Sequence, residues 1–120
     1  MKKIEFINYP KCSTCVKAKK WLENNGIDFD NRDIVTDNPN ESEIKKYLKI
    51  SGKEIKKFFN TSGILYREMN LKEKLVDMTE DEMIKLLATD GKLVKRPLIV
   101  TEKDVLIGFK EEEWKNFFKV

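Results

Sequence analysis

The stretch IEFINYPKCSTC, residues 4–15, decides the fold that the sequence predicts. Its first half, Ile4 to Tyr9, consists largely of β-branched and aromatic residues, which favour a strand, and Pro10 ends that run. Cys12 and Cys15 follow directly, with two residues between them. The cysteine pair is therefore expected where a first strand gives way to the next element.

A helix is predicted to begin at about Ser13, because apolar residues recur from there at helical spacing. The residues that share its apolar stripe are Cys15, Ala18 and Leu22. Ser13 or Thr14 can cap the start of this helix, and Gly26 can cap its end. A second strand over Asp28 to Ile34 would complete a β-α-β unit.

The middle of the chain is predicted to be helical. One helix spans Glu41 to Leu48 and is broken by Gly52, and a shorter segment spans Glu54 to Phe59. The sequence Thr79-Glu80-Asp81-Glu82 has the pattern of a capping box, which opens a further helix that ends at about Ala88.

The last quarter of the chain is predicted to hold a hairpin and a helix. Two short β-rich runs, Leu98 to Thr101 and Val105 to Phe109, have the spacing of a hairpin. A closing helix from Glu111 places three aromatic residues on one stripe, which would lie on the sheet: Trp114, Phe117 and Phe118. The predicted order is β-α-β, then helices, then β-β-α.

We expect a single domain over residues 1–120. The α/β core would comprise about residues 1–37 and 92–120, and the helical insertion about residues 38–91. A chain of 120 residues with 40% hydrophobic composition holds enough apolar material for one core. We further expect a monomer.

The composition argues against several classes of function. The 24 basic and 21 acidic residues leave a net charge of +3, and no basic block of the kind that binds nucleic acid is present, so direct nucleic-acid binding is not expected. No stretch approaches the roughly 18 apolar residues of a membrane span. The start of the chain lacks the apolar core of a secretory signal, which predicts a cytoplasmic protein. In that compartment a reactive role for the cysteines is favoured over a structural disulfide.

The cysteine pair predicts thiol-disulfide chemistry, because a C-x-x-C motif beside a β-α-β pattern is typical of thioredoxin-like redox proteins. Cys12 precedes the helix, whose free N–H groups and partial positive charge favour a thiolate, so Cys12 is the candidate nucleophile. Cys15 lies one turn further on and is the candidate resolving thiol.

The cysteine pair has two other possible interpretations. Both cysteines could be small buried hydrophobes. A C-x-x-C also supplies half of a zinc site, but the chain has no histidine and no third cysteine to complete one, so neither a metal nor another cofactor is expected. The absence of histidine also excludes a histidine-based triad.

Arg96 and Pro97 stand immediately before the third predicted strand. If that strand pairs with the first, Pro97 comes near Cys12, and Arg96 places a guanidinium where an oxyanion or a thiolate could be held. The alternative for Arg96 is a surface ion pair. The sequence leaves the isomer of the Arg96-Pro97 bond open.

Taken together, these motifs resemble the arsenate reductase-like family, which also contains the Spx-type transcription regulators. The resemblance spans essentially the whole chain and rests on I-x-F-I-N-Y-P-K-C-S-T-C, F-F-N-T-S-G, R-P-L-I-V and L-I-G-F. It implies a thioredoxin-like core with an inserted helical subdomain. It also implies that Cys12 is the nucleophile, that Arg96 helps to bind an oxyanion, and that thioredoxin or glutaredoxin with glutathione is the reductant.

The chain departs from the pattern of the arsenate reductases at two places. Asn60 and the region of Gly108-Phe109 stand where the resemblance would place further arginines, which leaves an arsenate site incomplete. The second cysteine is more similar to the Spx branch, in which a Cys-Cys switch changes binding to the RNA polymerase α-subunit. Two hypotheses therefore stay open: a thiol-dependent oxidoreductase, which we favour, and an Spx-type redox-switched regulator.

Overall fold

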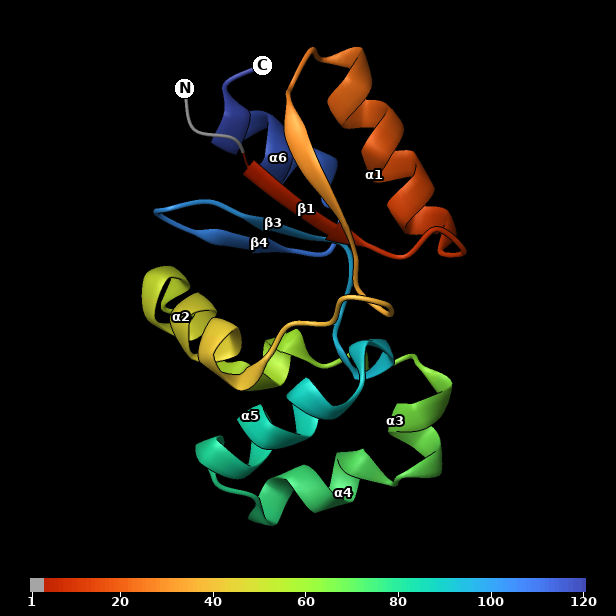
Figure 1. The fold of residues 1–120 in the computed structure, drawn as a ribbon, viewed down its shortest axis with the longest axis vertical. Helices are drawn as coiled ribbons and strands as arrows, with labels where there is room; N and C mark the ends of the chain where they lie inside the picture. The colour runs from red at the N-terminus through yellow and green to blue at the C-terminus, as the bar shows by residue number, and fades with distance from the viewer. Residues whose placement is uncertain (1–3) are drawn as a thin grey trace.

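The computed structural model describes residues 4–120 and holds one four-stranded sheet with helices on both faces (Figure 1). The strands lie in the order β2-β1-β3-β4. Their bounds are β1 Ile4–Asn8, β2 Phe29–Asp33, β3 Leu98–Val100 and β4 Val105–Ile107. β1 is parallel to β2 and antiparallel to β3, and β3 is antiparallel to β4. This α/β arrangement confirms the predicted fold class.

Helices α1 (Ser13–Asn24) and α6 (Glu111–Phe118) cover one face of the sheet (Figure 1). The inserted helices lie beyond the other face: α2 Glu41–Ser51, α3 Ile64–Glu68, α4 Leu71–Lys74 and α5 Glu80–Thr89. Three short 3-10 helices accompany them, at Ile55–Phe58, Leu75–Asp77 and Gly91–Leu93.

Side chains on the two faces of the sheet pack into two separate hydrophobic cores. In β1, Phe6 packs with Leu22 of α1 and Trp114 of α6, whereas its neighbour Ile7 joins the apolar cluster of the helical layer. Successive residues of a strand point to opposite faces, and β1, β3 and β4 each contribute to both cores. Trp114 is fully buried and donates its Nε1–H to the carbonyl oxygen of Gly108 at 3.2 Å.

The predicted helix ends are mostly confirmed. At the end of α1, Gly26 adopts a φ of +66° one residue beyond the cap, and its N–H donates to Glu23 at 3.1 Å. The capping box at Thr79 is present, and a second one stands at Asn40. Gly52 ends α2 in the left-handed conformation, at a φ of 67°, so this helix runs to Ser51 and not only to the predicted Leu48.

The expectation that Ser13 or Thr14 caps α1 is wrong. Cys12 itself is the N-cap, and no side chain caps this helix end. The helix begins one residue earlier than a serine cap requires, because the Cys12 carbonyl already accepts the first helical hydrogen bond, from Val16 N–H at 3.0 Å.

The helical layer holds more elements than the sequence predicted. Of the segment predicted over Glu54 to Phe59, Ile55–Phe58 forms a 3-10 helix, and neither α3 nor α4 was expected. These two helices have five and four residues, which is too short for apolar periodicity to mark them.

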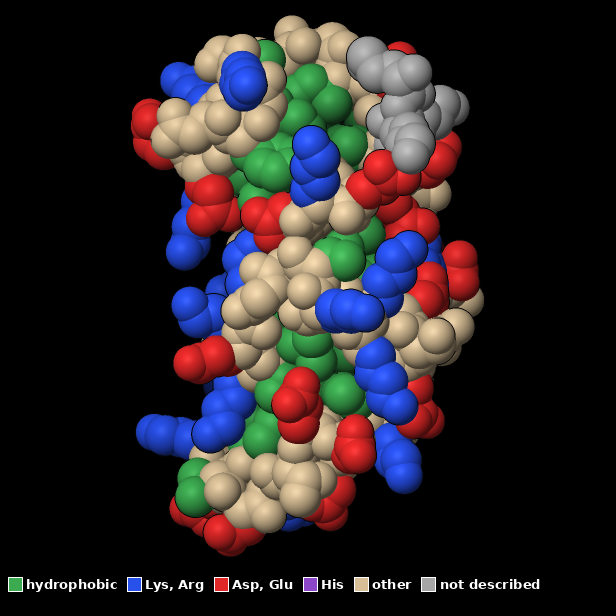
Figure 2. Space-filling view, turned by 90° about the vertical axis from the view of Figure 1, so that its left-hand side faces the viewer, with side chains coloured by type: hydrophobic (Ala, Val, Ile, Leu, Met, Phe, Trp, Pro, Cys, Tyr) green, Lys and Arg blue, Asp and Glu red, His purple; other side chains and the backbone are tan. Residues whose placement is uncertain are grey.

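The surface carries both signs of charge. Figure 2 shows the side over α2 and the β3–β4 hairpin, where basic and acidic side chains are interspersed with hydrophobic ones. No helix within residues 4–120 is long and apolar enough to cross a membrane. The expectation about a secretory signal rests on residues 1–3, which lie outside the described residues.

Candidate functional site

Cys12 lies where the chain leaves β1 and enters α1. Its N–H donates to the carbonyl oxygen of Tyr9 at 3.0 Å, which closes the turn around Pro10. The residue is partly exposed and lines a cavity. Cys15 lies one turn further along the helix, only 1% exposed, and its sulfur accepts a hydrogen bond from Tyr9 N–H at 3.5 Å. Both cysteines are free thiols.

The surroundings shift the pKa values of the two thiols in opposite directions. Partial burial raises the pKa of Cys12, but the backbone N–H and thiol of Cys15, together with the Arg96 guanidinium, outweigh it and hold that pKa below its ordinary value. Burial raises the pKa of Cys15 to about 12, and the neighbouring Cys12 sulfur adds to the rise. Cys12 is therefore the more readily ionised thiol.

Arg96 lies beside Cys12 because β3 pairs with β1. Pairing places Leu98 opposite Ile7, so the residues before β3 meet the residues after β1. The Arg96-Pro97 bond is cis. The Arg96 Cζ stands 5.1 Å from the centre of the Tyr9 ring, in a cation–π contact.

The surface ion pair considered for Arg96 does not occur with any residue among 4–120. Its Nη1 is instead buried without a hydrogen-bond partner in the described part of the chain. A buried cationic donor without a partner is costly. Arg96 also lines the cavity, where its positive charge would attract an anion.

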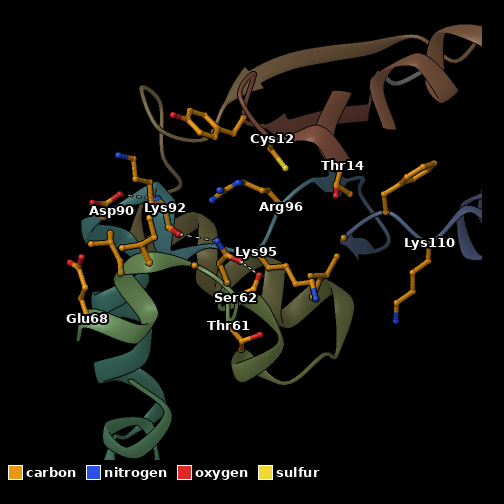
Figure 3. A pocket seen from close by; sticks show the side chains of 18 residues that line it. Cys12, Thr14, Thr61, Ser62, Glu68, Asp90, Lys92, Lys95, Arg96 and Lys110 are labelled. Atoms are coloured by element: carbon orange, nitrogen blue, oxygen red, sulfur yellow. Dashed lines mark hydrogen bonds between the residues drawn. The ribbon is translucent and has the colours of Figure 1, made fainter. Parts of the chain in front are cut away.

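The cavity at Cys12 has a volume of about 880 Å³ and is built by three parts of the chain. The start of α1 contributes Cys12 and Thr14, and the helical layer contributes residues 60–65. The sheet side contributes Arg96 and residues 107–110. In Figure 3 the Cys12 thiol points into this space, near Arg96.

Asn60, one of the positions where the resemblance would place an arginine, lines the cavity. Its backbone N–H donates to Leu93 at 2.8 Å, which anchors the loop after Phe59 to the segment before β3. Its side-chain Oδ1 accepts from Ser62 at 3.3 Å. The amide of Asn60 therefore presents a neutral polar group where a second cation would otherwise stand.

The sequence reasoning missed three lysines around the cavity, Lys92, Lys95 and Lys110 (Figure 3). Lysine is abundant and spread along this chain, so spacing alone carried no signal for them. Only Lys95 could have been suspected from the sequence, because it stands next to the candidate site residue Arg96.

No cluster of three or more histidine, cysteine, aspartate or glutamate residues suited to a metal ion occurs within residues 4–120. A partly exposed thiol with a lowered pKa can attack an electrophilic sulfur, and a second thiol stands one helical turn behind it.

Comparison with known proteins places this geometry in context. The model of the ArsC family matches residues 7–117. The uncharacterized protein YusI of Bacillus subtilis is 51% identical over 113 residues, which cover 94% of this chain and 96% of YusI. Regulatory protein MgsR, also of Bacillus subtilis, is 31% identical over 110 residues, which cover 92% of this chain and 86% of MgsR.

Solved structures of ArsC-related proteins are also similar to this chain. An ArsC family related protein from Bacteroides fragilis superposes with a TM-score of 0.92 at 59% identity, covering 96% of this chain and 97% of that one. A possible arsenate reductase from Streptococcus mutans superposes with a TM-score of 0.85 at 46% identity, covering 93% of this chain and 97% of that one.

Proposed function

Because the chain belongs to the ArsC family, we propose that it is a cytoplasmic thiol-dependent oxidoreductase in which Cys12 is the nucleophile and Cys15 the resolving thiol. The observation that carries this proposal is the contrast between the two sulfurs. Cys12 faces a large cavity and has a lowered pKa, whereas Cys15 is buried behind it and has a pKa raised to about 12.

The reaction proceeds in two exchanges. The Cys12 thiolate attacks one sulfur of a substrate disulfide, forming a mixed disulfide and releasing the other sulfur as a thiolate. Cys15 then loses its proton and attacks the Cys12 sulfur, which releases the second substrate thiol and leaves a Cys12–Cys15 disulfide. The substrate gains two electrons, and thioredoxin or glutaredoxin with glutathione returns two to the protein.

Arg96 would assist as a positioned cation. Its charge and hydrogen bond favour the Cys12 thiolate, and because Arg96 lines the cavity, its positive charge could attract an anionic group of the substrate. The arsenate reaction of the family is less well supported. Asn60 supplies an amide rather than a guanidinium at the cavity, so the charge that develops on an oxyanion would be stabilised less.

The proposal is tested with the variants Cys12→Ser and Cys15→Ser in a thioredoxin- or glutaredoxin-coupled assay of NADPH oxidation. Cys12→Ser should lose all thiol-dependent turnover, and Cys15→Ser should accumulate a mixed disulfide that mass spectrometry detects on Cys12. Ser42→Ala, on the exposed side of α2, serves as the control. Equal turnover in the two cysteine variants would refute the assignment of roles. Assays with arsenate in place of a disulfide distinguish the two substrates.

A second candidate is a redox-switched regulator of the Spx type, which binds the RNA polymerase α-subunit and responds to Cys12–Cys15 disulfide formation. The 31% identity to Regulatory protein MgsR over 92% of this chain favours it. The immobilised protein should then retain the C-terminal domain of the polymerase α-subunit in a manner that changes with oxidation. Absence of retention in both redox states would exclude this candidate.

A further inference from the structure

A second hollow adjoins the cavity at Cys12. Its volume is about 250 Å³, and it shares Thr61, Lys95, Ile107 and Lys110 with the first cavity. Buried Phe59 contributes an apolar part of its wall. The two hollows therefore share a wall and together extend the site from Cys12 toward the 3-10 helix Ile55–Phe58.

The second hollow is strongly basic. Five lysines line it against a single carboxylate, that of Glu113: Lys53, Lys56, Lys57, Lys95 and Lys110. The Lys53 ammonium is neutralised by Asp104 at 3.0 Å. The other four lysines are exposed, and none forms an ion pair with any residue in 4–120. Arg96 extends the same positive charge to the Cys12 sulfur.

The backbone holds one of these lysines between the two hollows. Lys95 N–H donates to the Phe58 carbonyl at 2.7 Å. A Cβ built on Gly108 would lie 3.2 Å from Lys95 Cε, so the stem of Lys95 passes close over this glycine. Unpaired cations gathered along a hollow attract anions and raise their local concentration more strongly than lysines scattered over the surface do.

We propose, resting on the function proposed above, that the substrate is a small disulfide whose non-reacting end carries two or more anionic groups, phosphate or carboxylate. The reacting sulfur lies at Cys12, and the anionic end extends past Lys95 and Lys110 toward Lys56 and Lys57. Lysine ammonium groups act as mobile point charges, which suits either kind of anion. The two exchanges are those described above, and the substrate leaves as two thiols.

The test measures how fast three disulfides oxidise the reduced protein: coenzyme A disulfide, glutathione disulfide and the uncharged 2-hydroxyethyl disulfide. Each rate constant is divided by that of dithiothreitol with the same disulfide, which removes intrinsic reactivity. The normalised rate for coenzyme A disulfide or glutathione disulfide should exceed the uncharged one at least about tenfold. Whichever of the two reacts faster identifies phosphate or carboxylate as the preferred anion.

The double variant Lys56→Ala/Lys57→Ala should lower this preference several-fold, because both side chains line the basic hollow. The control, Lys72→Ala/Lys74→Ala, removes the same charge from exposed positions of α4. In the unchanged protein the preference should also fall as salt rises from about 20 mM to about 500 mM, because screening weakens exposed charges.

The outcomes separate the two proposals. If none of the disulfides oxidises Cys12, the proposed function fails and this inference fails with it. If the uncharged disulfide reacts at Cys12 but the normalised preference is near one, or if both double variants change it equally, only the polyanionic substrate is refuted.

Discussion

Cys12 and Cys15 have identical side chains, but their different positions shift their pKa values in opposite directions. Both thiols lose hydration, but only Cys12 receives enough stabilisation for its thiolate, from the Cys15 N–H and thiol and from Arg96. For Cys15 burial dominates, and its pKa rises to about 12. The partly exposed Cys12 is therefore the more readily ionised thiol, while the buried Cys15 thiol stays protonated at neutral pH.

Replacing Arg96 by glutamine should raise the pKa of Cys12, because the guanidinium supplies both a hydrogen bond and a positive charge to its thiolate. The rate of alkylation of Cys12 by iodoacetamide at pH 7 should fall about threefold or more, and its pH profile should move to higher pH. Peptide mapping by mass spectrometry assigns the label to Cys12.

The matched control for this measurement is Arg67→Gln, which removes a guanidinium from the exposed surface of α3. Its pH profile should coincide with that of the unchanged protein. A profile that stays in place in the Arg96 variant would show that Arg96 does not stabilise the thiolate.

At the scale of elements, local hydrogen bonds decide where the longer helices begin. Thr79 and Asn40 each accept from a backbone N–H three residues ahead, at 3.2 Å and 2.8 Å, and the glutamate there returns the bond. Four contiguous residues contain each motif, so each can be recognised without knowledge of the fold. Asn40-Glu41-Ser42-Glu43 has the same pattern and opens α2, so this capping box is recognisable from the sequence as well.

Thr79→Ala should lower the free energy of unfolding by about 1 kcal/mol, because the Glu82 N–H loses the hydroxyl that accepts its hydrogen bond. Urea denaturation monitored by circular dichroism measures the change. Thr79→Ser keeps the hydroxyl and should recover most of the loss. Equal destabilisation by both substitutions would point to the methyl group instead of the cap.

A second pair of elements, β2 and α2, is joined by an ion pair between Arg32 and Glu43. Two nitrogens of the guanidinium donate to the two carboxylate oxygens, at 2.7 Å and 2.9 Å. The Arg32 side chain is only 10% exposed and that of Glu43 is 32% exposed. The hydrogen bonds from Arg32 hold the pKa of Glu43 below its ordinary value of 4.5, despite partial burial.

Glu43→Gln should lower the free energy of unfolding at pH 7 by about 1 to 2 kcal/mol, since the charged acceptor of Arg32 is lost. A carboxyl whose folded pKa is depressed stabilises the fold above its unfolded pKa and ceases to do so as pH falls. The difference from the unchanged protein should thus be full at neutral pH and shrink below about pH 4.5. Glu41→Gln, exposed on the same helix, should show a much smaller effect, and a pH-independent difference for Glu43→Gln would contradict the argument.

At the scale of the whole molecule, the sheet separates two cores. The Cys12 cavity is lined by residues of both the sheet side and the helical layer. Close backbone contact holds the two parts together at this point. Gly91, in the 3-10 helix before β3, approaches Ile34, the residue after β2, so closely that an added Cβ would stand 1.7 Å from the Ile34 carbonyl oxygen. Asn38 adds a hydrogen bond to the Ala88 carbonyl at 2.8 Å.

Gly91→Ala should lower the free energy of unfolding by roughly 3 kcal/mol or more, because the clash is with backbone that cannot rotate away. Thermal denaturation followed by circular dichroism measures it. Gly52→Ala is the comparison, since its Cβ would meet open space and only the φ of +67° opposes it, at a cost of about 1 kcal/mol. The interpretation is wrong if Gly91→Ala is no more destabilising than Gly52→Ala.

The sequence by itself determined the fold class, the order of the strands and longer helices, and the place of the cysteine pair. Strand residues, the C-x-x-C spacing, glycine stops and capping boxes are local signals, each complete within a few neighbouring residues. The first strand ends one residue before the predicted Tyr9, at Asn8, which is a shift typical of element ends. The roles assigned to Cys12, Cys15 and Arg96 remain predictions.

Only the tertiary structure decided what surrounds the thiol. The cation–π contact of Arg96, the basic hollow at Lys56 and Lys57, and the ion pair of Arg32 join residues far apart in the chain. The opposite pKa shifts of the cysteines also depend on burial, which is a property of the packed molecule. Strand pairing and packing bring these groups together, and no pattern of neighbouring residues records which distant side chains will meet.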